Sequence, residues 1–123
     1  MVGAETLAWH YSEATAGLCL SLTNYSLIPQ EMMACGLPCV DVAGGSTEAE
    51  LGVDSGVALA KADPVELADA LEHLLDEPAE WRRRSEAGLA LVEGASWDVA
   101  ARQVEAGLRE ALRERELVAF GAR

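Results

Sequence analysis

The feature that most constrains the fold is a set of three short apolar runs, at residues 18–22, 38–42 and 56–60. Each run is too short for a buried helix and has the length of a strand. Segments with the apolar spacing of helices lie between and after these runs. Strands that alternate with helices pair in parallel, and the helices then cover the faces of the sheet. The sequence therefore predicts an α/β fold with a small parallel sheet and a helical C-terminal part.

Local signals mark the expected helices. Helices are predicted at residues 4–15, 29–35 and 47–51, and three more follow residue 63. Asp63 is suited to an N-cap position, and Glu66 completes a capping-box pattern with it. Ser96 is expected to cap the last helix. The apolar seam of that helix consists of Ala100, Val104, Leu108 and Leu112.

Charge is spread unevenly along the 123 residues, whose net charge is −12. Residues 1–81 hold fourteen acidic side chains and one basic one, Lys61. Such a chain repels the phosphates of nucleic acids, so nucleic-acid binding is not expected. No apolar run reaches the length of a membrane span and the N-terminus does not resemble a signal peptide, which favours a cytoplasmic protein without a transmembrane segment. The odd number of cysteines favours free thiols.

The polar segment after the first apolar run leads to Pro29, which favours an extended residue before it and begins a helix. Free N–H groups at such a helix start, at the carboxyl end of a parallel strand, attract phosphates. Glu31 falls in the first turn. Its carboxylate can accept hydrogen bonds from the vicinal hydroxyls of a ribose, or it can reach back to cap its own helix. Spacing alone leaves both interpretations open.

Residues 31–40, EMMACGLPCV, resemble the E-A-M-A-C-G-x-P-V-V segment of GT-B glycosyltransferases of the family 4, or group 1, type. Flanking segments match that family in the same order over nearly the whole chain. These are residues 5–14, the GGSTE turn at 44–48, residues 54–59, Asp63-Pro64 and Ser96-Trp97. The resemblance implies a partial Rossmann-like unit, the GT-B C-terminal domain. Residues 1–123 would then form one truncated nucleotide-sugar-binding domain.

The resemblance also implies a site for a nucleotide-diphosphate-sugar donor. Glu31 would bind the ribose, a loop of four residues would approach the diphosphate or the sugar, and a glycine turn would contact the nucleotide or the sugar. The loop residues are Thr23, Ser26, Leu27 and Ile28, and the turn is Gly44-Gly45. No catalytic residue is assigned, because Thr23 stands where many members carry a second glutamate. No metal or other cofactor is expected, since GT-B enzymes generally need none for the chemistry.

The expected function is donor binding in a glycosyltransferase that transfers a hexosyl or rhamnosyl group, with retention, to a glycan or another acceptor. The run at 23–29 is similar to a rhamnosyltransferase-like branch. The N-terminal acceptor domain and the basic residues that neutralise the diphosphate in the family are missing from this sequence. The chain alone is therefore expected to be inactive, to bind nucleotides only in the millimolar range, and to form a homodimer at high concentration. A UDP-sugar epimerase-like GT-B domain and a non-catalytic interaction module are the alternatives.

Three further features have structural interpretations. Glu48 either faces the same cleft as Gly44-Gly45 or caps a short helix. Asp41 stands in the middle of a strand and lacks the acidic and basic partners of a phosphoacceptor. The Arg82-Arg83-Arg84 run is interpreted as the solvated face of a helix.

Overall fold

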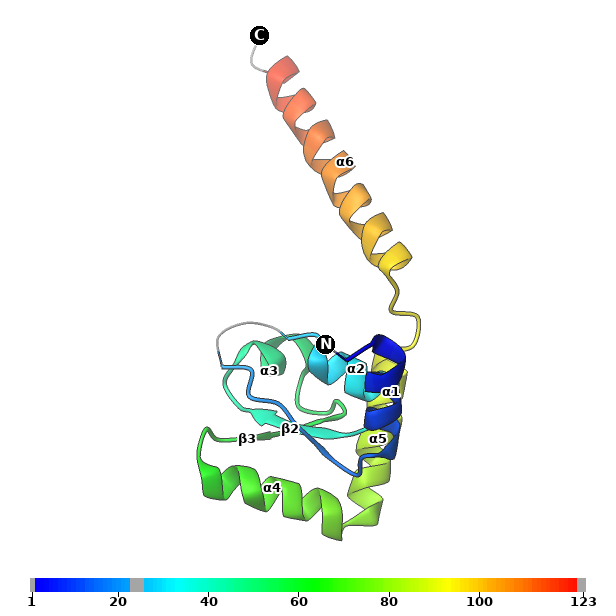
Figure 1. Ribbon diagram of the computed structural model, residues 1–123. Coiled ribbons are helices and arrows are strands. Elements are labelled where there is room, and N and C mark those ends of the chain that lie inside the picture. The colour runs from blue at the N-terminus through cyan, green and yellow to red at the C-terminus, as the bar shows by residue number, and fades with distance from the viewer. Residues whose placement is uncertain (1, 23–25, 122–123) are drawn as a thin grey trace. The chain divides into compact units, whose positions relative to one another are not determined.

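The computed structural model describes residues 2–22 and 26–121, and Figure 1 shows the course of the chain. The chain divides into two compact units, Met1–Glu93 and Gly94–Arg123, and each is described by itself. The second unit contains one long helix. In chain order the elements are α1 (Ala4–Glu13), β1 (Gly17–Leu18), α2 (Ile28–Ala34), β2 (Cys39–Val42), α3 (Ser46–Leu51), β3 (Val57–Ala60), α4 (Pro64–Asp76), α5 (Pro78–Val92) and α6 (Trp97–Gly121).

The sheet has three parallel strands in the order β1-β2-β3. Cys39 on the central strand is paired with Gly17 on one side and with Val57 on the other. This confirms the predicted α/β class with a small parallel sheet. Because all three strands run in the same direction, the segments that follow them emerge at one edge of the sheet.

Helices cover the two faces of the central strand. On one face, Cys39 packs in a cluster with Met33 of α2 and Val57 of β3. On the other face, Val40 packs against Leu74 of α4. Figure 1 shows α4 on one side of β2 and β3, with α2 and α3 on the other. The alternation of side chains along β2 therefore separates two small hydrophobic cores.

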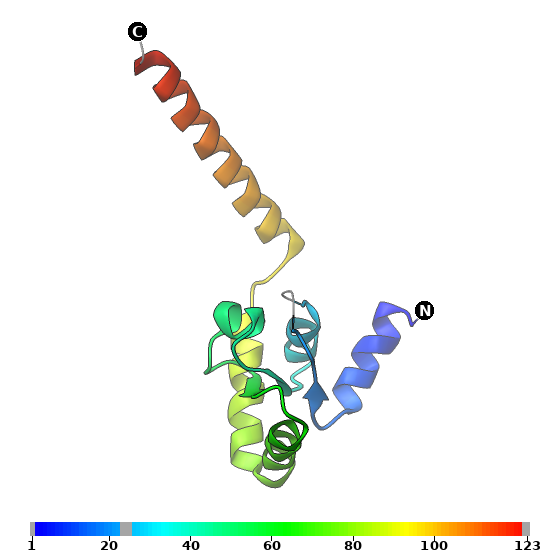
Figure 2. The same cartoon turned by 90° about the vertical axis from the view of Figure 1, so that its left-hand side faces the viewer.

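The first strand differs from the prediction of a buried strand over residues 18–22. Regular pairing covers only Gly17–Leu18, and burial alternates along the segment. The residues that face away from the core are 47%, 58% and 64% exposed, and they are Leu18, Leu20 and Leu22. Because β1 lies at the edge of the sheet, next to α1 in Figure 2, α4 covers the neighbouring strands and leaves this leucine face open. The prediction that the run is wholly buried is wrong.

Helix starts agree with the sequence where the signal is local. The Asp63 carboxylate accepts hydrogen bonds from two N–H groups in the first turn of α4, at 2.9 and 3.2 Å. The Ser96 hydroxyl accepts the N–H of Val99 at 3.2 Å. Glu66 departs from the capping-box prediction, since its carboxylate pairs with Lys61 at 2.9 Å. A cation two residues before the cap competes successfully for this carboxylate.

The arginine run on α5 is not uniformly solvated. Arg82 and Arg83 are exposed, as predicted, but only 14% of the Arg84 side chain is accessible. Its guanidinium donates to the carbonyl oxygens of Ser55 and Val57, at 3.2 and 2.6 Å, where β3 begins. For Arg84 the prediction of a solvated side chain is wrong, because it attaches α5 to β3.

The three cysteines are free thiols, as predicted. Cys19 and Cys39 are buried, whereas Cys35 at the end of α2 is partly accessible. Across the described ranges, no helix has both the length and the apolar composition needed to cross a bilayer.

Candidate functional site

The carboxyl ends of the three strands place the predicted site segments along one edge of the sheet. Ser21 and the described loop residues 26–28 follow β1, the Gly44-Gly45 turn follows β2, and Lys61 follows β3. Figure 2 looks onto this edge. In open α/β sheets, ligands bind at the carboxyl edge. The parallel topology therefore brings together segments that are up to 40 residues apart in sequence.

Asp41 is the buried centre of this edge. Its side chain is fully buried, and Oδ1 accepts the backbone N–H groups of Ser21 and Val42, both at 2.8 Å. Oδ2 accepts the hydroxyl of Thr47, also at 2.8 Å. Burial alone would raise the pKa of Asp41, but these hydrogen bonds outweigh burial and lower the pKa below its usual value. The carboxylate is thus held ionised by donors from three different segments.

The Gly44-Gly45 turn is held from two directions. Gly44 has a φ of +77°, in the region that favours glycine, and its N–H donates to the Glu48 carboxylate at 2.6 Å. Gly45 approaches the first strand so closely that a Cβ there would lie 3.1 Å from the carbonyl oxygen of Ser21. Of the two interpretations of Glu48, the structure supports capping, because its carboxylate reaches back across the first turn of α3.

The described part of the loop after β1 leads directly into α2. The Ser26 hydroxyl accepts the N–H of Ile28 at 3.2 Å, so this predicted site residue organises the helix start. Leu27 occupies the N-cap position of α2, and the side chains of Leu27 and Ile28 are 48% and 45% exposed. Thr23, the remaining predicted loop residue, lies outside the described residues. The helix begins one residue earlier than predicted and has seven residues.

Glu31 is exposed on the first turn of α2. Its backbone N–H donates to the carbonyl oxygen of Leu27 at 3.0 Å, while no hydrogen bond joins its carboxylate to any residue in the described ranges. The capping-box geometry is therefore not formed there. Tyr11 of α1 lies nearby: burial first, and then the charge of Glu31, raise the pKa of the Tyr11 hydroxyl.

A small pocket opens where β1 ends. Its volume is about 270 Å³. The residues that line it are Leu18, Cys19, Leu20, Ser21, Ser26 and Ile28. The pocket thus joins the end of the strand to two of the predicted loop residues. Glu31 is one turn further along α2 and is not part of this lining.

Positive charge is scarce at this edge. Among the described residues of the segments that follow the three strands, the basic side chain is that of Lys61. It is 79% exposed and paired with Glu66. The hydrogen bond to Glu66 is the main reason that the pKa of Lys61 is raised. Arg84 is engaged at the opposite end of β3. No group of three or more metal-ligating side chains is found in the part of the chain that the structure describes.

Two residues that organise the edge were not predicted as site residues. The sequence predicts a strand position for Asp41 and a short helix that contains Thr47, and no site role for either. The available signal was an acidic residue between two valines in a strand expected to be buried, since such a carboxylate needs several donors. The positions of those donors follow from the tertiary fold, which is why spacing along the chain did not reveal them.

Curated glycosyltransferases are similar to this chain in sequence. A D-inositol 3-phosphate glycosyltransferase from Frankia alni is 38% identical over 109 residues, which cover 86% of this chain and 26% of the relative. A protein of the same name from Thermobifida fusca is 34% identical over 112 residues, 88% of this chain and 25% of the relative. The chain thus spans about a quarter of the length of the curated relatives it matches. No family model matches the chain.

The fold leads to the same group of proteins. A sucrose-phosphate synthase from Thermosynechococcus elongatus superposes with a TM-score of 0.76 and 26% identity, covering 93% of this chain and 29% of the synthase chain. Sequence similarity and fold therefore agree over nearly all of the residues. In both respects, this chain corresponds to part of the C-terminal domain of a GT-B glycosyltransferase.

Proposed function

We propose that this chain supplies nucleotide-sugar donor binding to a glycosyltransferase that transfers a hexosyl or rhamnosyl group. The observation that carries the proposal is Glu31, an exposed carboxylate that the described residues leave without a hydrogen bond. It lies in the segment that resembles the donor-binding motif of the family. A carboxylate in this state can accept both hydroxyls of a ribose without giving up an existing contact.

The neighbouring residues have mainly shaping roles in this proposal. Ser26 occupies the N–H of Ile28, and Glu48 occupies the N–H of Gly44. These amides become available to a phosphate only when the two side chains move aside. The absence of a Cβ at Gly44 and Gly45 leaves room for a ligand to approach the backbone of the turn.

Electrostatics limit the affinity of the chain by itself. A nucleotide diphosphate meets Lys61, already paired with Glu66, and an excess of acidic side chains. Like charges weaken such binding. We therefore propose millimolar nucleotide affinity for the isolated chain. In a complete GT-B enzyme, further basic residues and the acceptor site would come from regions that this chain does not span.

The proposals for the acceptor and for the stereochemistry of transfer rest on the relatives and on the family resemblance. The curated relatives are named for D-inositol 3-phosphate, and a phosphorylated polyol is one acceptor consistent with that name. Retention of the anomeric configuration is proposed from the family resemblance. A second candidate function, a protein-interaction module, is favoured by the open leucine face of β1 and by the scarcity of positive charge.

A titration of the ¹⁵N-labelled chain with UDP tests donor binding. Amide signals of residues 26–31 and of Gly44-Gly45 should shift with millimolar UDP. Glu31→Gln should weaken UDP binding about tenfold, because a charged acceptor of ribose hydroxyls is lost. The same substitution should change the affinity for 2′-deoxy-UDP less, since one of the two hydroxyls is already absent.

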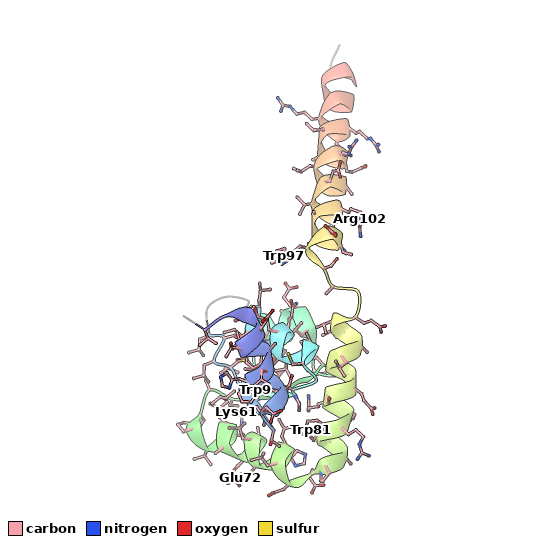
Figure 3. The ribbon with its side chains drawn as sticks, turned by 45° about the vertical axis from the view of Figure 1, so that its right-hand side comes forward. Trp9, Lys61, Glu72, Trp81, Trp97 and Arg102 are labelled. Carbon is pink, nitrogen blue, oxygen red and sulfur yellow. The ribbon has the colours of Figure 1, made fainter. Side chains whose placement is uncertain are left out.

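Glu72→Gln is the matched control. Glu72 is an exposed acid on α4 and, in Figure 3, points away from the sheet. Glu72→Gln changes the net charge by the same amount as Glu31→Gln but should leave UDP binding unaltered. Equal losses in the two variants would attribute the effect to net charge and contradict a ribose contact. Micromolar affinity in the unmodified chain would contradict the electrostatic argument, and absence of any shift would favour the interaction module.

A further inference from the structure

The proposed site consists of two segments that are far apart along the chain and meet only in the folded structure. One is the segment that follows β1, at Ser21, and the other is the Gly44-Gly45 turn after β2. Donor binding requires that these segments keep a fixed separation. Among the described residues, the backbones of the two segments come close at one point, where a Cβ on Gly45 would lie 3.1 Å from the carbonyl oxygen of Ser21. A side chain that contacts both segments would set that separation.

We infer that Asp41 is the positioning residue of the site: its carboxylate fixes Ser21, in the segment after β1, relative to α3 and thereby to the Gly44-Gly45 turn that precedes α3. One oxygen accepts the N–H of Ser21 at 2.8 Å, and the other accepts the hydroxyl of Thr47 at 2.8 Å. The first contact reaches the segment that follows β1, and the second reaches the first turn of α3, directly after the Gly44-Gly45 turn. This inference rests on the proposed donor-binding function for its consequence, but not for the geometry.

Burial makes the connection stiff. Asp41 and Thr47 are both fully inaccessible, so water does not replace a lost hydrogen bond. An ionised carboxylate in this environment needs each of its donors, and the loss of one leaves an unsatisfied charge. A change at Thr47 is therefore transmitted through Asp41 to the N–H of Ser21, which lies in the wall of the pocket.

Asp41 also holds β2 itself, through the N–H of Val42 at 2.8 Å. Its removal would disturb the strand as well as the connection between the segments. Thr47→Val is therefore the sharper substitution, because it keeps the volume and branching of the side chain and removes only the hydroxyl. Thr47→Ser is its counterpart, since it keeps the hydroxyl and removes a methyl group.

A structural control is available at the opposite end of the sheet. Ser55 is buried, and its hydroxyl donates to the carbonyl oxygen of Gly52 and accepts the N–H of Val57. Ser55→Ala, like Thr47→Val, removes one buried hydroxyl; the Ser55 hydroxyl makes two hydrogen bonds. It should lower the stability of the chain without altering the carboxyl edge.

Amide hydrogen exchange of the full 123-residue chain, without ligand, tests the geometry. After correction for global stability, Thr47→Val should accelerate exchange at Ser21 about tenfold, because local opening becomes easier there. Thr47→Ser should restore the slow exchange of Ser21, and Ser55→Ala should leave it slow. Exchange at Ser21 that follows global stability in all three variants would overturn the inference.

UDP titration of the same variants tests the consequence. Thr47→Val should weaken UDP binding about tenfold, whereas Thr47→Ser should bind within about twofold of the unmodified chain. Equal binding by Thr47→Val and the unmodified chain would overturn the positioning role. If the unmodified chain shows no UDP-dependent shifts, the proposed function fails, and the exchange data still decide whether Asp41 connects the two segments.

Discussion

Two acidic side chains of this chain owe their ionisation to different surroundings. Asp41 has no access to water and depends on N–H and hydroxyl donors. Glu80 on α5 retains 22% of its side-chain accessibility and pairs with two arginines: Arg83 at 2.7 Å and Arg84 at 2.6 Å. The hydrogen bond from Arg83 is the largest cause of the lowered pKa of Glu80. Burial raises this pKa, whereas the charge and the hydrogen bond of Arg84 lower it further, and the resulting pKa is about 2.

This pKa predicts an acid-sensitive contribution to stability. Because the folded state holds the pKa of Glu80 at about 2, below its ordinary value of 4.5, the contribution is fully present above the ordinary value. It is lost as the pH falls from there toward 2. Glu80→Gln should therefore lower the free energy of unfolding by about 1 kcal/mol at pH 7, a value reduced by solvent screening. The difference from the unmodified chain should shrink at pH 2.5, as measured by urea denaturation.

Glu105→Gln is the comparison for this prediction. Glu105 pairs with Arg109 at 2.6 Å, but the two side chains are 60% and 69% exposed. Such a pair contributes only about 0.3 kcal/mol. A loss at Glu80 that is no larger than at Glu105, or that persists unchanged at low pH, would contradict the role of the two arginines.

The roles of residues whose partners are local can be predicted from the sequence. Asp63 and Ser96 were predicted as caps, and both accept N–H groups within the next three residues. The solvated Arg84 is a wrong prediction and the role of Asp41 is not predicted, because each has a distant partner. Arg84 meets carbonyl oxygens 27 and 29 residues away, and Asp41 meets the N–H of Ser21 20 residues away, only in the folded sheet. For Glu31, the structure removed the capping alternative, while ribose binding remains a prediction.

Helix α5 meets the sheet where two glycines lie against one methionine. A Cβ on Gly88 would lie 2.8 Å from Cγ of Met33, and a Cβ on Gly56 would lie 2.9 Å from Cα of Gly88. Met33 is itself 1% exposed and part of the core. The small residues thus allow α5, α2 and the start of β3 to share one tightly packed crossing.

Gly88→Ala should therefore destabilise the chain although alanine favours helix. Overpacking against Met33 outweighs the gain in helix propensity, and the net loss is expected to be about 1–2 kcal/mol. Thermal unfolding followed by circular dichroism measures it. Gly107→Ala is the control: Gly107 lies within α6, and a Cβ there meets no atom within 4 Å, so the substitution keeps the gain in helix propensity without the overpacking. A stabilised Gly88→Ala variant would show that the crossing has room to relax.

The elements also show where prediction from sequence stops. The bounds of α4, α5 and α6 follow from proline and capping signals within a few residues. The burial of β1 was predicted incorrectly, because an apolar run does not reveal how far a helix from elsewhere in the chain extends over it. Only the pairing order, with β1 at the edge, explains the exposed Leu18, Leu20 and Leu22.

Exposed apolar side chains follow each other along α6. Val104, Leu108 and Leu112 recur at intervals of four residues, and their exposed fractions are 63%, 62% and 59%. Apolar rows of this kind associate with one another in water. We predict that two copies of the chain pair through this row at high concentration.

Light scattering over a concentration series measures this association. The unmodified chain should approach the mass of a dimer, and Leu108→Glu should remain a monomer because it places a charge within the row. Leu20→Lys, on the leucine face of β1, should leave the dimer intact. A monomer of the unmodified chain at high concentration would contradict the prediction, and loss of the dimer in Leu20→Lys would assign it to the edge strand.

The accessibility of the thiols has a practical consequence. Cys19 and Cys39 are buried, whereas Cys35 is partly accessible, so a thiol-reactive fluorophore should attach selectively at Cys35 in the folded chain. Cys35 follows Glu31 by four residues, at the end of the same helix, and residues with that separation are neighbours on a helix surface. The chain therefore carries its own attachment point for an optical reporter beside the proposed ribose contact, and no cysteine needs to be introduced or removed.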